Sequence, residues 1–139
     1  MISLDQAREM VALARAKGRE MGLKPLSVAV LDAGGHLLAF EREDGASPGR
    51  FEIARGKAHG AVMLGMPGSA QMARAEDQAY FMAAVNGALG GKVVPVPGGV
   101  LVIREGAVLG AVGVTGDSSD NDSAAAIAGI EAAGFEARA

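Results

Sequence analysis

VVPVPGGVLVIREGAVLGAVGVTGDSSDNDSAAAIAGIEAAG, from Val93 to Gly134, is the stretch that decides the fold of this 139-residue chain. Residues 100–104 and 107–115 alternate as strands do, and the pair Glu105-Gly106 between them suits a two-residue hairpin turn. On the second strand both faces carry small or apolar residues. A strand of that kind is typical of the centre of a sheet, so we expect it to be covered on both sides.

The two ends of this stretch predict an edge strand and a helix. Residues 93–96 alternate, but Pro95 cannot donate to a sheet ladder, so we expect an edge strand there. The acidic segment 117–122 precedes an alanine-rich run that ends at Gly134. Carboxylates before a helix accept its free N–H groups, and the spacing does not fit a calcium loop. We therefore expect the acids to cap a closing helix and not to bind a metal ion.

Upstream, the pattern predicts a helix, a hairpin and further helices. Residues 3–22 form an amphipathic helix that Ser3 and Gln6 can cap reciprocally. Residues 27–42 form a hairpin about Gly34-Gly35, residues that accept the positive φ of a tight turn. A second helix follows over residues 50–64. Residues 70–88 favour helix in their first half and are least clear in their second half, where glycine pairs break the pattern.

The expected fold class is α/β of the α+β type. The order is helix, two strands, one or two helices, three strands, helix, which gives a mostly antiparallel five-stranded sheet covered by helices. We expect residues 1–139 to form a single domain, since the length suits one domain and not two.

Composition excludes several classes of protein. Cysteine is absent, which rules out disulfides, thiolate zinc sites and iron–sulfur clusters. The formal net charge of −3 gives no basic surface for nucleic acid. No apolar run reaches the roughly 20 residues that span a membrane, and no secretion signal opens the sequence, so we expect a soluble cytoplasmic protein. Aromatic residues make up only 4% of the chain, which favours burial through self-association.

The candidate chemical groups are few. His36 follows the first hairpin turn, where it either bonds the turn backbone or serves as a ligand or acid–base group. His59 shares a helix face with Glu52 and Arg55, and either pairs with that carboxylate or contacts a flat ligand. Arg42 and Arg55 either clamp a carboxylate or form a solvated rim. Tyr80 is the only tyrosine. No nucleophile–base pair and no H-x-x-x-H spacing are present, so we expect no metal site.

Two stretches resemble the GlcG/HbpS-like family, also called the haem-degrading or DUF336 family. They are SVAVLDAGGHLLAFEREDGA, residues 27–46, and the run from Pro97 to Gly134, and the Lys57-Ala58 pair matches as well. The resemblance covers nearly the whole chain. It implies a profilin-like architecture, assembly into homo-oligomers and, for some members, binding of haem or a related tetrapyrrole.

The resemblance and the residues leave open three functions. The first is a small-ligand-binding protein for haem, with His36 or His59 as axial ligand, Tyr80 behind them and Lys57 as a further cofactor-binding candidate. The second is an enzyme acting on a small oxygenated acid or aldehyde, with His36 as acid–base group and Arg42 or Arg55 as clamp. The third is an accessory protein that associates with a metabolic enzyme. Whether the protein is an enzyme is not decided by the sequence.

Overall fold

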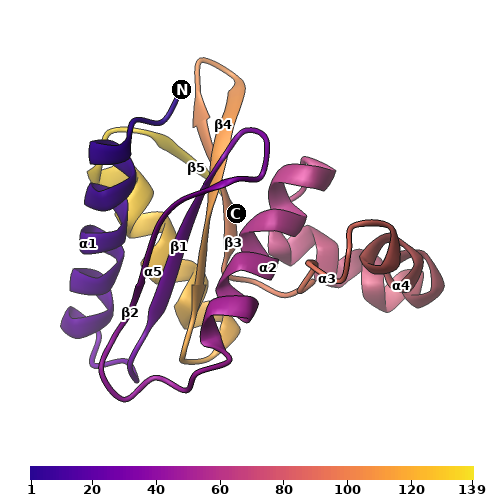
Figure 1. Cartoon of the computed structure of the whole chain (residues 1–139), viewed down its shortest axis with the longest axis horizontal. Coiled ribbons are helices and arrows are strands. Elements are labelled where there is room, and N and C mark those ends of the chain that lie inside the picture. The colour runs from indigo at the N-terminus through magenta and orange to yellow at the C-terminus, as the bar shows by residue number, and fades with distance from the viewer.

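The computed structural model describes residues 1–139 and has one antiparallel sheet with helices on both faces (Figure 1). The strands are β1 (Ser27–Asp32), β2 (Leu37–Arg42), β3 (Gly99–Arg104), β4 (Ala107–Thr115) and β5 (Glu136–Arg138). Their order across the sheet is β2-β1-β4-β3-β5. The helices are α1 (Leu4–Glu20), α2 (Arg50–Leu64), α3 (Gly68–Asp77), α4 (Ala79–Ala88) and α5 (Ser119–Ala132). The predicted α/β class, with a five-stranded antiparallel sheet, is confirmed.

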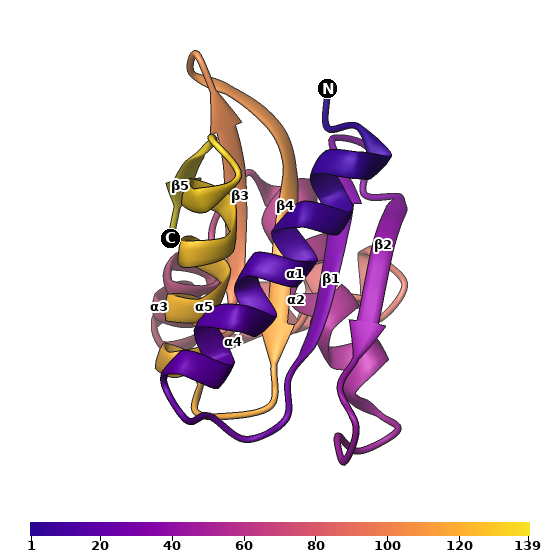
Figure 2. The same ribbon diagram turned by 90° about the vertical axis from the view of Figure 1, so that its left-hand side faces the viewer.

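The helices divide between the two faces of the sheet. Figure 2 shows α1 and α5 packed side by side on one face, with α2 behind the sheet. Because alternate residues of a strand point to opposite faces, β1 contributes to both cores. Val28 and Val30 join the larger core, under α1 and α5, together with Met10 and Ile130. Leu31 joins the smaller core, under α2.

The predicted central strand is confirmed. β4 pairs with β1 on one side and with β3 on the other, and residues 110–115 are buried. A Cβ atom on Gly113 would lie 2.0 Å from the carbonyl oxygen of Ala54 in α2. Glycine at this position therefore lets helix and strand backbones approach each other closely.

The cap of α1 is the one that the sequence predicts, whereas the cap of α5 is not. Ser3 and Gln6 form the predicted capping box, and Gly22 has the expected positive φ of 69° after α1. In the first turn of α5, the backbone N–H of Asn121 donates to the hydroxyl of Ser118 and not to a carboxylate. Asp122 is instead buried and binds Lys57.

One prediction of local structure is wrong, the edge strand at residues 93–96. Residues 93–96 form no strand, because the N–H of Val94 donates to Gly56 of α2 and the N–H of Val93 donates to the Asn86 side chain. The fifth strand is β5, which follows α5 and pairs with β3. Residues 70–88 form two helices, with a break at Gln78, where φ is −138° and ψ is 68°.

The helical hairpin of α3 and α4 projects from the side of α2 that faces away from the sheet (Figure 1). No helix of the chain combines the length and the apolar character that crossing a membrane would require.

Candidate ligand site

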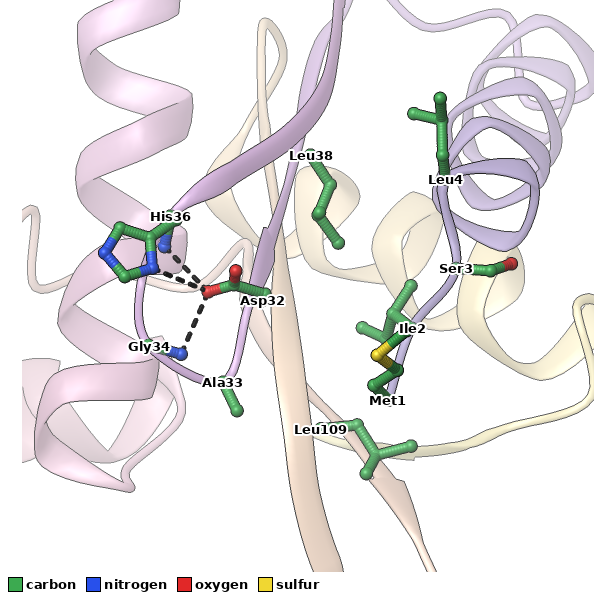
Figure 3. Close-up of a pocket in the computed structure, with 10 residues that line it drawn as sticks. All are labelled: Met1, Ile2, Ser3, Leu4, Asp32, Ala33, Gly34, His36, Leu38 and Leu109. Atoms are coloured by element: carbon green, nitrogen blue, oxygen red, sulfur yellow. Dashed lines mark hydrogen bonds and ion pairs between the residues drawn. The ribbon is translucent and has the colours of Figure 1, made fainter.

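The main hollow of the molecule lies between the N-terminal segment and the turn that joins β1 to β2 (Figure 3). Its volume is about 700 Å3. Six of its ten lining residues are hydrophobic, and the full set is Met1, Ile2, Ser3, Leu4, Asp32, Ala33, Gly34, His36, Leu38 and Leu109. Pockets that hold cofactors and small molecules are typically this large and this apolar, with a few polar groups that fix the orientation of the ligand.

The polar groups of the hollow come from one tight turn. Asp32 Oδ1 accepts hydrogen bonds from the backbone N–H groups of Gly34 and His36, each 2.9 Å long. The same oxygen lies 3.3 Å from His36 Nδ1. The backbone hydrogen bond from His36 lowers the pKa of the Asp32 carboxyl, so this group is ionised near neutral pH.

The Asp32 carboxylate therefore lies within ion-pair distance of the imidazole of His36. A carboxylate that accepts from Nδ1–H fixes the tautomer with the Nε2 lone pair free, which is how metal-binding histidines are commonly held. The His36 side chain is 81% exposed. Figure 3 shows it at the edge of the hollow, with Asp32 between its ring and the apolar side chains.

His59 lies against the same turn from the side of α2. A Cβ atom on Gly35 would meet its Cδ2 at 3.2 Å, and His59 Nδ1 is 3.0 Å from the carbonyl oxygen of Lys92. A carbonyl can only accept, so Nδ1 carries the hydrogen and Nε2 is the free lone pair. Burial lowers the pKa of His59, so the ring is neutral near pH 7.

The structure thus places both histidines of the chain on the Gly34-Gly35 turn. The sequence did not predict this, since the two residues belong to different elements and only the packing of α2 on the turn brings them together. The other side chain against Gly35 is Met63, one helical turn after His59, and its thioether is a third metal-binding type of group at this place. The spacing of four residues between His59 and Met63, which puts both on one face of the helix, is the sequence signal of their proximity.

Lys57 does not line the hollow, and its ammonium group is buried and hydrogen-bonded. Its side chain is 3% exposed, and Nζ donates to the carbonyl oxygen of Val114 and to Asp122 Oδ2, at 3.0 and 3.1 Å. Burial lowers the pKa of Lys57 and raises that of Asp122, because removal from water disfavours both charges. The ammonium group has no face open to a cofactor.

Two of the three residues predicted as catalytic, His36 and Arg42, lie apart in the chain. His36 precedes β2 and Arg42 ends it, and a strand of this length separates its ends by roughly 20 Å. Arg55 pairs with Glu52 and lies over the ring of Phe51, with its guanidinium carbon 5.1 Å from the ring centre. His36 and Arg42 therefore do not form an acid–base group with a nearby carboxylate clamp.

Tyr80 is also remote from the hollow. It lies on α4, beyond α3, and is 74% exposed (Figure 1). Nowhere in the chain do three His, Asp or Glu side chains gather as they would to hold a metal ion by themselves.

Comparison with known proteins gives the family. Residues 2–131 match the family described as "Haem degrading protein HbpS-like". The chain is 33% identical over 116 residues to Protein GlcG of Escherichia coli K12, covering 78% of this chain and 80% of that protein. It is 31% identical over 121 residues to a 15.0 kDa protein of the dhaT-dhaS intergenic region of Citrobacter freundii, covering 87% and 84%. The chain belongs to the HbpS-like family, as its sequence motifs indicated.

Solved structures agree with this assignment. HbpS of Streptomyces reticuli, as a double mutant, superposes with a TM-score of 0.80 at 29% identity, covering 94% of this chain and 85% of that one. The DUF336 protein ORFY of Klebsiella pneumoniae gives 0.83 at 26% identity, covering 95% and 90%. A PduOC:heme complex gives 0.87 at 24% identity, covering 99% and 98%, and shares the fold.

Proposed function

We propose that this protein binds haem or a related tetrapyrrole, with His36 as the axial ligand at the edge of the hollow. The observation that carries the proposal is the imidazole of His36, held 3.3 Å from the Asp32 carboxylate beside an apolar hollow of about 700 Å3. Membership of a family described as haem degrading and HbpS-like supports it.

The residues of the site fit such a group. The macrocycle is flat and apolar, and Ile2, Leu4, Leu38 and Leu109 offer it apolar contacts. The iron needs a neutral nitrogen ligand, and the Asp32–His36 pair leaves Nε2 free for this purpose. When bound, the iron would supply the redox and ligand chemistry of the protein. This chain's own residues orient the imidazole and shield one face of the ring from water.

His59 is the second candidate for the axial ligand. It stands on the same turn, and its lowered pKa keeps it in the neutral form that binds iron. Its ring, however, packs against Gly35 and is less open than that of His36. We therefore rank His36 first.

We also propose that the protein forms homo-oligomers through the α3–α4 hairpin. All residues of α4 except Asn86 and Gly87 are apolar or aromatic, yet only Met82 is buried in the single chain. A second copy of the chain would cover this surface, and burial of exposed apolar area is the usual basis of such contacts. The cytoplasmic location remains a prediction of the sequence.

The test is a titration of the purified protein with haemin, followed by the Soret band. The wild-type protein should give a saturable shift, His36→Ala should weaken or abolish it, and His59→Ala should have a smaller effect. Tyr80→Phe is the matched control, because its ring lies outside the hollow, and it should bind as the wild type does. The absence of any Soret shift, or a shift unchanged in the double variant His36→Ala/His59→Ala, would overturn the proposal.

A further inference from the structure

A second pocket lies at the opposite end of β1 from the turn that carries His36. It has a volume of about 240 Å3 and is formed where three connections meet. Lys24 comes from the α1–β1 connection, Ser47 from the β2–α2 connection and Gly116 from the β4–α5 connection, and Arg50 opens α2. These connections gather at the lower end of the molecule in Figure 1.

Neither cation of this pocket forms an ion pair. The lysines and arginines in the ion pairs of the chain are Arg15, Lys17, Arg19, Arg55 and Lys57, and neither Lys24 nor Arg50 is among them. The two positive charges therefore share one pocket without an opposite charge in ion-pair contact. No acidic residue lines the pocket.

The guanidinium of Arg50 is fixed in place. It is half-buried, and Nη1 donates to Thr115 Oγ1 at 2.8 Å, which leaves its other N–H groups unused. Ser27 stands directly opposite Thr115 in the ladder, and its buried hydroxyl has no partner. A buried polar group without a partner costs free energy, and this hydroxyl belongs to the strand residue paired with the hydrogen-bond partner of Arg50.

The N-terminus of α2 adds a positive electrostatic potential, which favours an anion. No side chain caps its first turn, so free N–H groups and the positive end of the helix dipole lie at the pocket. The carboxylate of Asp117 accepts hydrogen bonds from the N–H of Lys24, the N–H of Ser118 and the amide of Asn121. The hydrogen bond from Asn121 and, to a smaller extent, the charge of Lys24 lower the pKa of Asp117, so this acid is ionised and engaged by groups of its own surroundings.

We propose that this pocket binds a small oxyanion, the phosphate or carboxylate group of a small molecule. Arg50 would hold two of its oxygens in the fork geometry that guanidinium groups favour, while Lys24 and the Ser47 hydroxyl contact the others. The site is independent of haem, since it lies at the other end of β1. Failure of one proposal leaves the other intact.

The experiment titrates the full-length protein with inorganic phosphate at constant ionic strength, with chloride as the balancing salt. Binding is followed by ¹H–¹⁵N spectra and by calorimetry, and a parallel titration with acetate separates a phosphate site from a carboxylate site. We expect saturable shifts at Gly45, Ser47 and Gly116. Arg50→Gln and Lys24→Gln should each weaken binding by about tenfold, the effect of losing one charged hydrogen bond.

One control variant, together with Lys24→Gln, makes the outcome decisive. Arg8→Gln is the matched control, because Arg8 is exposed on α1 without an ion pair, and it should bind as the wild type does. Lys24→Gln removes a side chain that makes no hydrogen bond, so it tests the site even if Arg50→Gln is poorly folded. Equal affinity in Lys24→Gln and the wild type, shifts centred elsewhere, or no saturable binding of either anion would overturn the proposal.

Discussion

Lys57 Nζ lies 3.1 Å from Asp122 Oδ2, and this buried ion pair joins helices that cover opposite faces of the sheet. Lys57 belongs to α2 and Asp122 to the first turn of α5. The pair also holds the end of the central strand, because Nζ donates to the carbonyl of Val114 and Asp122 Oδ1 accepts from the N–H of Asp117. The ion pair therefore links α2, the sheet and α5 at one position.

Removal of one partner of this pair should be costly. Lys57→Met or Asp122→Asn leaves the other group unpaired in the interior, and we expect each to lower the free energy of unfolding by about 3–5 kcal/mol. The double variant removes both charges and should cost clearly less than the sum of the two single variants. Urea unfolding of the three variants measures this. Additive losses would show that the two groups are not coupled.

Gly113 should tolerate no side chain. A Cβ there would lie 2.0 Å from the Ala54 carbonyl oxygen, so Gly113→Ala forces α2 away from β4. We expect a loss of about 3 kcal/mol, at the upper end for overpacked cores. Gly87→Ala is the control, because nothing lies within 4 Å of its added methyl group and it should gain up to about 1 kcal/mol of stability. Similar thermal midpoints for the two variants would contradict the close contact of α2 with β4.

Asp117 should contribute stability that acid removes. Its hydrogen bonds, the largest effect coming from the Asn121 amide, lower its pKa from 3.8 to about 2. A lowered carboxyl pKa stabilises the fold above the unfolded pKa of about 3.9, and this contribution disappears as the pH falls toward 2. Asp117→Asn should therefore lose less stability than the wild type between pH 5 and pH 2, measured by urea unfolding. Parallel curves for the two proteins would contradict it.

Tyr80 should report on self-association. If α4 contacts a second copy, Tyr80→Glu places a charge in an apolar interface and should lower the mass measured by sedimentation equilibrium. Leu37→Glu is the control, since Leu37 is also exposed, at 46%, but lies on β2. Dissociation by Leu37→Glu and not by Tyr80→Glu would move the interface to the hairpin of β1 and β2.

Much of the fold could be predicted because its determinants are local. The hairpin at Glu105-Gly106, the capping box of Ser3 and the two apolar faces of β4 each depend on residues a few positions apart. The position of the fifth strand could not be predicted in this way. Residues 93–96 have the pattern of a strand, but their N–H groups find partners in α2 and α4, and β3 pairs with the short β5 instead.

Some features of the candidate site could likewise be predicted from the sequence, and others could not. The sequence by itself determined the tight turn at Gly34-Gly35 and the position of His36 beside it, because turn geometry needs only adjacent residues. Tertiary structure alone decided that His59 packs on that turn and that Lys57 is buried against Asp122. These relationships depend on how α2 and α5 pack on the sheet, and contacts between residues distant in sequence leave no periodic pattern in the chain.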